Sequence, residues 1–187
     1  GSDYTAAIIA YCLEAESMTI WKDVPGVLNA DPRYFSETVL LNHISYEEAI
    51  ELAYYGASVI HPKTMQPLQN TEIPFFVKSL INPLDQGTAV KKGTPLEPLT
   101  PCFILKKNQH LVRFSSKDFS FITEDKLSGI FNQLHDAKIK VNLMQNSAIS
   151  LSLCLEDNYN NLNDFLSQLN ETYQISHEND VNLYTIR

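Results

Sequence analysis

The chain has 187 residues, 44% of them hydrophobic, which supports a packed core and argues against intrinsic disorder. The formal net charge is −8 and no basic run exceeds two residues, which argues against a nucleic-acid partner. No apolar stretch approaches the roughly 20 residues of a membrane helix, so we expect neither a membrane segment nor a signal peptide. Cys12, Cys102 and Cys154 lack CxxC spacing and have apolar neighbours, which predicts buried thiols in a reducing cytoplasm.

The first part of the chain predicts alternating helices and strands. Apolar residues recur at helical spacing over residues 3–16, where Ser2 or Asp3 can cap a helix. Ser45 and Glu48 form a capping box, and the helix that they start is expected to end at Gly56. The other elements expected are a strand over 18–21, a helix over 62–70 and a strand over 73–78. This alternation predicts an α/β layer with a largely parallel sheet.

A polar loop follows the first predicted strand. The segment from Thr19 to Arg33 reads TIWKDVPGVLNADPR and holds two turn signals, PG and DP. Its charged and amide side chains come just after the carboxyl end of a strand, where open α/β sheets bind ligands. From spacing alone, a ligand site and a solvated surface loop are equally supported.

The second half of the chain has a different rhythm. Residues 93–101 are expected to form a linker between a domain over 1–92 and a domain over 102–187, because prolines and a glycine interrupt any periodicity there. The elements expected after it are strands over 111–115, 140–144, 149–155 and 173–176, and helices over 125–137 and 162–169. Their order, βαββαβ, is that of a ferredoxin-like fold. A further strand is expected over 181–186.

Four segments, taken together, resemble the aspartate kinases (aspartokinases). They are Gly1–Ala7, which reads GSDYTAA; Trp21–Gly26, with the pattern W-x-D-V-P-G; Asp31–Arg33, which reads DPR; and Glu48–Pro62, which begins EAIEL and ends VIHP. Their order and spacing both fit, so the set is far more specific than any single motif.

The resemblance implies a fold and an activity. The α/β fold would be a partial amino-acid-kinase three-layer αβα sheet followed by an ACT domain, the ferredoxin-like amino-acid-sensing module of this family. Residues 181–187 would then open a second ACT domain. The reaction would be ATP-dependent phosphorylation of the L-aspartate β-carboxylate to 4-phospho-L-aspartate. This is the first step of lysine, threonine and methionine biosynthesis, and it would be feedback-regulated through the ACT domains.

The resemblance also assigns substrate residues. Gly1, Ser2 and Asp3 would line the aspartate site, with Ser2 donating to a carboxylate and Asp3 accepting from the ammonium; the alternative is that both only cap a helix. ATP, carried as its Mg²⁺ complex, would contact these residues: Lys22, Asp23, Leu28, Arg33, Ser58 and Val59. Three of them depart from the family, which often has Thr or Ser at 22, Tyr at 28 and Lys at 58. His61 could be a general base, but His before Pro at a helix start is more often structural.

An amino-acid effector is the second ligand that the resemblance implies. The matching positions are Thr123, Lys126, Val141, Asn142 and Ser147. Lysine-sensing relatives often place Asp at position 142 and Glu at position 148, so lysine, threonine and no effector all stay open here. The alternative is that Val141 and Leu143 simply fill the sheet core, and for Val141 alone this alternative is favoured.

The family's Lys-Phe-Gly-Gly segment, whose lysine contacts the phosphates, is missing from this sequence. We therefore expect the chain to be an inactive fragment, with the main catalytic residues unknown and Gly1-Ser2 either native or a tag scar. A homodimer through ACT domains is expected. The alternative is an amino-acid-sensing ACT module without catalysis; a glutamate or uridylate kinase relative fits less well. A parent fused to homoserine dehydrogenase also stays open.

Overall fold

The computed structural model of the chain describes residues 1–57 and 59–187. The chain divides into two units, one formed by residues 1–105 with 184–187 and one by residues 106–183. The predicted linker, 93–101, lies inside the first unit and close to its boundary. Each unit has its own sheet and its own buried core, so each is described separately.

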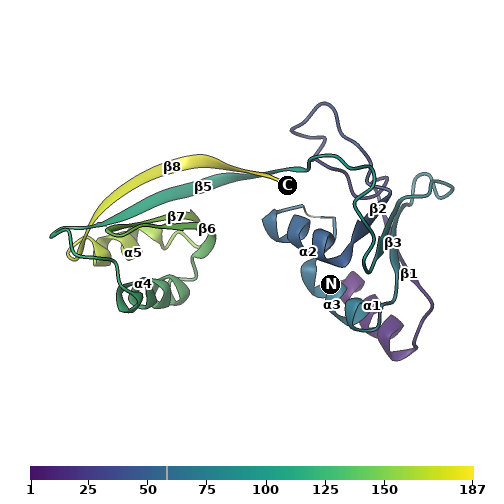
Figure 1. Ribbon diagram of the computed structural model, residues 1–187, viewed down its shortest axis with the longest axis horizontal. Coiled ribbons are helices and arrows are strands. Elements are labelled where there is room, and N and C mark those ends of the chain that lie inside the picture. Colours follow the sequence, from purple (N-terminus) through teal and green to yellow (C-terminus); the bar gives the residue numbers. More distant parts are fainter. Residues whose placement is uncertain (58) are drawn as a thin grey trace. The chain divides into compact units, whose positions relative to one another are not determined.

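The first unit is an α/β layer built on a four-stranded sheet. Its elements are α1 (Ser2–Cys12), β1 (Met18–Lys22), β2 (His43–Ser45), α2 (Tyr46–Tyr55), α3 (Pro62–Asn70), β3 (Phe75–Ser79) and β4 (Thr88–Lys91) (Figure 1). The strand order is β1-β3-β4-β2. β1 pairs in parallel with β3 and β2 with β4, whereas β3 and β4 are antiparallel. The sheet is therefore mixed, with parallel pairing at both edges.

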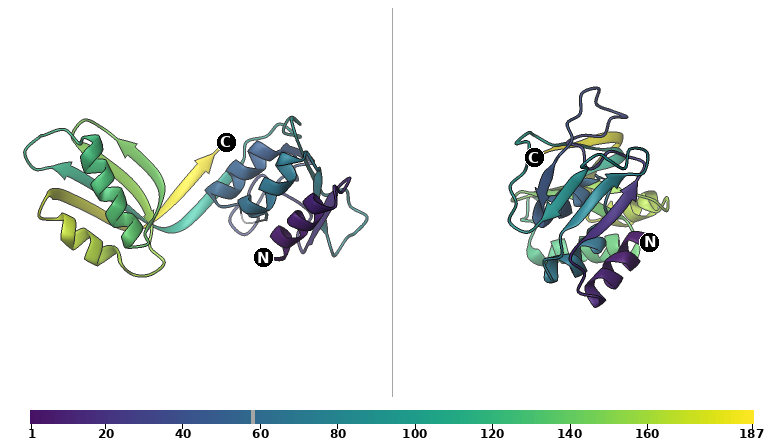
Figure 2. Two further views of the ribbon diagram at one scale, coloured as in Figure 1. Left: turned by 90° about the horizontal axis from the view of Figure 1, so that it is seen from below. Right: turned by 90° about the vertical axis from the view of Figure 1, so that its right-hand side faces the viewer.

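Buried and exposed side chains alternate along the strands, so one face of the sheet packs against the helices. Met18 and Ile20 are buried on β1, whereas Thr19 and Trp21 between and after them are exposed. Helices α1, α2 and α3 lie together beside the sheet (Figure 2). The buried side chains of the helices and strands form one hydrophobic cluster. Within the described residues, the helices thus cover one face of the sheet, which gives two of the three predicted layers.

The ends of two helices test the capping predictions. Ser45 caps α2 as predicted, since its Oγ accepts a hydrogen bond from the Glu48 N–H at 3.1 Å, and Gly56 follows the last turn with φ 124°. Helix α1 forms where a helix was predicted, but its cap and its end differ from the prediction. Gly1 occupies its N-cap position without a side-chain hydrogen bond, and the helix ends at Cys12 rather than at residue 16.

The second unit has the ferredoxin-like order that the sequence predicts. Its elements are β5 (Phe103–Ser116), α4 (Glu124–Asp136), β6 (Lys140–Asn146), β7 (Ser150–Glu156), α5 (Leu162–Leu169) and β8 (Tyr173–Ile186). The strand order is β6-β7-β5-β8, and β7 is antiparallel to both of its neighbours. The strand expected over 181–186 is the continuation of β8, which runs without a break for 14 residues.

Helices α4 and α5 lie on one face of the second sheet (Figure 2). Phe114 is fully buried there, with Phe165 and Tyr173 in edge-on contact at centroid distances of 6.1 and 6.0 Å. Ile130 and Leu134 of α4 close the same cluster. These contacts give the unit a hydrophobic core of its own.

Two of the three cysteines are buried, as predicted. Cys102 and Cys154 are buried and free, but Cys12 is exposed, because it lies in the last turn of α1 on the side away from the core. No helix among the described residues has the length and apolar character needed to cross a bilayer.

Candidate functional site

Several polar side chains lie at the carboxyl edge of the parallel pair β1 and β3. Lys22 and Ser79 end the two strands directly opposite each other. The chain turns at this point, where the Leu80 N–H donates to the Lys22 carbonyl at 2.7 Å and Ser79 Oγ accepts from the N–H groups of Ile81 and Asn82. Ligands bind at such an edge in open α/β sheets.

The amino-terminal turn of α1 reaches this edge. Lys22 Nζ donates to Asp3 Oδ2 at 2.8 Å, and the exposed fractions of the two side chains are 30% and 26%. The ion pair joins a residue expected to bind aspartate to one expected to bind the nucleotide. Spacing in the sequence gave no sign of this contact, because the two residues lie on different elements. The half-buried pair places an anion and a cation beside a helix N-terminus, which itself favours anions.

The loop after β1 is held by buried polar groups. Asn29 is 6% exposed, accepts from the Val39 N–H at 2.7 Å and donates to the Pro101 carbonyl at 2.9 Å. Thr88 Oγ1 accepts from the Val27 N–H at 2.8 Å. A Cβ on Gly26, whose φ is +155°, would lie 2.6 Å from Thr88 Oγ1, so the loop needs glycine there. These contacts give the W-x-D-V-P-G segment a fixed path.

Arg33 is engaged within its own turn. Asp31 accepts from Arg33 Nε at 3.0 Å and from its NH2 group at 2.6 Å, and its Oδ1 also accepts from the Arg33 N–H. The hydrogen bonds from Arg33 hold the pKa of the Asp31 carboxyl below its usual value. A phosphate group that used the Arg33 fork would have to displace this carboxylate. Asp23 is exposed on the same loop.

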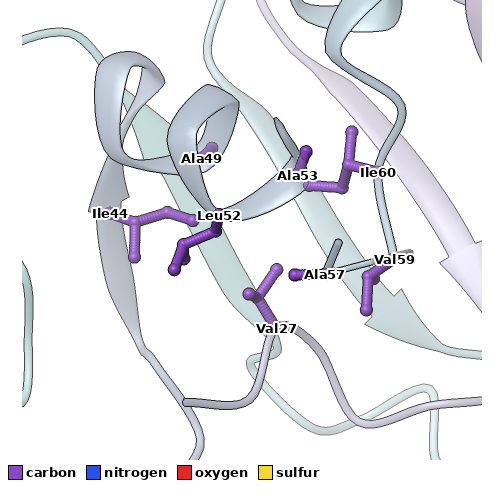
Figure 3. Close-up of a pocket in the computed structure, with 8 residues that line it drawn as sticks. All are labelled: Val27, Ile44, Ala49, Leu52, Ala53, Ala57, Val59 and Ile60. Atoms are coloured by element: carbon purple, nitrogen blue, oxygen red, sulfur yellow. The ribbon is translucent and has the colours of Figure 1, made fainter. Parts of the chain in front are cut away.

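Two other residues assigned to the nucleotide, Leu28 and Val59, have apolar neighbours. Leu28 pairs with Leu40 in an isolated bridge. Val59 is half-buried and faces a small pocket whose lining is entirely aliphatic, formed by Val27, Ile44, Ala49, Leu52, Ala53, Ala57, Val59 and Ile60 (Figure 3). Such a lining suits core packing rather than a nucleotide. Ser58 lies outside the described residues.

His61 has a structural role in the arrangement. It is the N-cap of α3, and its Nδ1 accepts from the Lys63 N–H at 3.1 Å. His61 thus has the structural role that is more common for a histidine before proline at a helix start.

The predicted effector residues fall into two groups. Thr123 is the N-cap residue of α4, and Lys126 in its first turn donates to Ser120 Oγ at 2.7 Å. The Ile122 N–H donates to the Ala148 carbonyl at 2.9 Å, which brings this segment beside Ser147 in the turn after β6. These three positions therefore share one end of the second unit.

Asn142 lies near the other end of β6, about five residues and roughly 16 Å of extended strand from Ser147. The register shifts between Val141 and Leu143, so Asn142 is the extra residue of a β-bulge and is 6% exposed. Its amide donates to Gln109 Oε1 at 2.6 Å and to Glu156 Oε2 at 3.1 Å. Val141 packs against the core, in line with its structural alternative, whereas its neighbour Leu143 is 51% exposed.

A lysine completes the network around Asn142. Lys106 Nζ donates to Asn142 Oδ1 at 2.8 Å, so every polar atom of the amide group has a partner. Burial and the nearby charge of Lys140 lower the pKa of Lys106. Burial opposes ionisation of Glu156, but hydrogen bonds from Asn158 and Asn142 outweigh it and lower its pKa. Sequence analysis missed these partners of Asn142, because Lys106 and Gln109 lie on β5, more than thirty residues away in the chain.

Comparison with known proteins supports the motif assignment. The amino acid kinase family profile matches residues 1–79. The lysine-sensitive aspartokinase 3 of Escherichia coli is 38% identical over 156 residues, which are 83% of this chain and 34% of that protein. The aspartokinase of Saccharomyces cerevisiae is 34% identical over 175 residues, 82% of this chain and 33% of that protein. The chain thus spans about a third of the length of these curated relatives.

Solved structures give the same result for the fold. The crystal structure of E. coli aspartokinase III in complex with lysine and aspartate superposes with a TM-score of 0.84 at 34% identity, covering 100% of this chain and 42% of that chain. The aspartate kinase of Clostridium acetobutylicum superposes with a TM-score of 0.87 at 26% identity, covering 100% of this chain and 44% of that chain. Both likenesses extend over the two units described above. The chain therefore belongs to the aspartokinase family and corresponds to part of its longer members.

Proposed function

We propose that the chain is part of an aspartate kinase that transfers a phosphoryl group from ATP, as its Mg²⁺ complex, to the β-carboxylate of L-aspartate. The observation that carries this proposal is the Asp3–Lys22 ion pair at the carboxyl edge of β1 and β3. It supports the proposal because a carboxylate that could accept from the substrate ammonium lies beside a cation that could neutralise phosphate charge. The solved relative in complex with aspartate and ADP binds this pair of ligands, which supports the same choice here.

The proposed roles follow from charge. The α-ammonium of aspartate binds Asp3, and one substrate carboxylate binds at the N-terminus of α1 beside Ser2. Lys22 is then freed from Asp3 by the substrate ammonium, and its Nζ neutralises charge on the transferring phosphoryl group. Phosphoryl transfer depends mainly on such positioning and charge neutralisation. Gly1 completes the turn at the helix start.

The nucleotide is proposed to lie along the loop after β1. Asp23 contacts it from the exposed side of that loop, and Arg33 exchanges Asp31 for a phosphate. Leu28 pairs with Leu40 and Val59 faces an aliphatic pocket, so the proposal gives neither residue a polar contact with the nucleotide.

For the second unit we propose an ACT role, in which an amino acid binds and regulates the kinase, with a homodimer as the assembly. The crystallised E. coli relative in complex with lysine supports lysine as the first candidate. We propose two contact regions for the effector. One is formed by Thr123, Lys126 and Ser147, and the other by Asn142 with its hydrogen-bond partners. The cytoplasm is the proposed compartment, because all three cysteines are free.

Aspartyl phosphate formation tests the catalytic proposal. A longer polypeptide that carries this chain and the rest of an aspartokinase should, with ATP and Mg²⁺, convert L-aspartate to a product that hydroxylamine traps as the hydroxamate. The 187-residue chain alone should give none. A longer polypeptide that consumes no ATP in the presence of aspartate would contradict the proposal.

An amino-acid sensor without catalysis is the second candidate, and the separate core of the second unit favours keeping it. Calorimetric titration of the chain with lysine, threonine and methionine shows whether the chain alone binds an amino-acid effector. Saturable heat with one amino acid would assign the effector. No heat with any of them would contradict a complete effector site within the chain.

A further inference from the structure

Two histidines and an asparagine converge on neighbouring strands of the second unit. His110 lies on β5, and His177 and Asn179 lie on β8, the strand beside it. His110 Nδ1 is 3.3 Å from His177 Nε2 and 3.1 Å from Asn179 Oδ1. The two imidazole rings are tilted by 45° with centroids 5.4 Å apart. None of these residues takes part in the proposed substrate or effector contacts.

We propose that His110, His177 and the Asn179 amide oxygen form a site for a borderline divalent transition metal such as Zn²⁺. Two imidazole nitrogens bound to one tetrahedral Zn²⁺ at about 2.0–2.1 Å are separated by roughly 3.3 Å. The observed separation matches this value, whereas a direct N–H···N hydrogen bond would be expected nearer to about 2.9–3.0 Å. Water would complete the coordination shell.

The surroundings suit a cation. The carboxylate of Asp157 interacts electrostatically with His110, so a negative charge already lies near the pair. No group of three or more His, Cys, Asp or Glu side chains in residues 1–57 and 59–187 is placed to bind a metal, so the site depends on two imidazoles and an amide.

A metal at this site would tie β5 to β8. The affinity of the site for divalent metals should follow the Irving–Williams order, with Cu²⁺ binding more tightly than Zn²⁺. Mg²⁺ should not bind, because it prefers oxygen ligands. The site is therefore independent of the Mg²⁺ that accompanies ATP in the proposed reaction.

Calorimetric titration with ZnCl₂ tests the site on the intact chain. We expect one saturable Zn²⁺ site. His110→Gln and His177→Gln should each lower the Zn²⁺ affinity by about tenfold or more, because mutating even a residue that only hydrogen-bonds to a metal ligand lowers metal affinity by about 10–100-fold. His135→Gln, an exposed histidine in the last turn of α4, is the matched control and should bind as the wild type does. Unchanged affinity in either His110→Gln or His177→Gln, or no saturable binding, would overturn the proposal.

A measurement on the unaltered chain guards against variants that misfold. In ¹⁵N spectra of the histidine rings, Zn²⁺ should shift the signals of His110 and His177 and leave those of His43, His61 and His135 in place. Shifts confined to any of the latter three would refute the site.

Discussion

Asn142 is the most constrained polar side chain of the second unit. It lies in a β-bulge, is 6% exposed and hydrogen-bonds to Lys106, Gln109 and Glu156. The sequence marked the position as important but could not show why, because its partners come from β5 and β7. At the scale of residues, sequence analysis singled out Asn142 as a candidate but did not predict its contacts. The ion pair between Asp3 and Lys22 is a second contact that it did not predict.

Asn142→Asp should destabilise the chain by about 1–3 kcal/mol at neutral pH, because the new carboxylate loses two donated hydrogen bonds and lies against Glu156. Paired carboxylates take up a proton more readily in the folded state than in the unfolded one, so the penalty should shrink as the pH falls. Urea unfolding at several pH values measures both effects. Asn146→Asp, at the exposed end of the same strand, is the control and should change stability little. Equal effects of the two substitutions would refute this account of Asn142.

At the scale of elements, long periodic segments were predicted well and short ones were missed. The helix that begins after Ser45 and the order of the second unit follow from capping chemistry and apolar spacing. The strands β2 and β4 span only three and four residues, too few for a periodic signal, and they form by pairing with each other and with β3. The α1 cap was mispredicted, because Gly1 fills the position that Ser2 or Asp3 could have taken.

Ser45→Ala should lower the free energy of unfolding by about 0.5–2 kcal/mol, because it removes the hydrogen bond that caps α2. Thr123→Ala is the matched control. Thr123 holds the same position at α4 with a similar extended backbone but makes no side-chain cap hydrogen bond, so its loss should cost less. Chemical denaturation of the two variants compares them directly. A larger effect for Thr123→Ala would contradict the assigned caps.

The carboxylate of Asp157, at the start of α5, should make the stability of the fold depend on pH. Burial opposes ionisation of Asp157, but the N–H groups of Leu162, Asn161 and Tyr159 donate to its carboxylate and lower its pKa. A carboxyl whose pKa is lowered by folding stabilises the fold at pH values above its unfolded-state pKa of about 3.9. This stabilisation is lost as the pH falls through the folded-state pKa.

Asp157→Asn should therefore destabilise the chain near neutral pH and flatten the acid limb of its stability profile. Thermal unfolding between pH 3 and pH 7, about the range that brackets an ordinary carboxyl, measures both. Asp164→Asn, in the first turn of α5, is the control. A variant profile parallel to that of the wild type would rule out this role for Asp157.

At the scale of the whole molecule, the buried apolar residues of 1–57 and 59–187 form two hydrophobic clusters that share no member. Sequence analysis predicted the two fold types from the change in rhythm along the chain. It did not predict that β5 and β8 would each contribute residues to both units. Only residues 111–115 of β5 were expected to be a strand, and β8 was expected to be two shorter strands.

Separate cores should give separable unfolding. Phe75→Ala and Phe114→Ala each empty a fully buried position, one in each cluster, and each should cost about 3–5 kcal/mol. In calorimetric scans, Phe75→Ala should lower the transition of the first unit most, and Phe114→Ala that of the second. Identical displacement of a single transition by both variants would show that the chain unfolds as one cooperative body.

The central claim is that the Asp3–Lys22 edge belongs to an aspartate kinase active site. The most direct test is steady-state kinetics of a longer polypeptide that contains this chain, with Asp3→Asn, Lys22→Met and, as control, Asp164→Asn, another first-turn acid. We predict that Asp3→Asn raises the KM for aspartate and lowers kcat, that Lys22→Met acts mainly through ATP turnover, and that Asp164→Asn behaves as the wild type. Wild-type kinetics for Asp3→Asn would contradict the account.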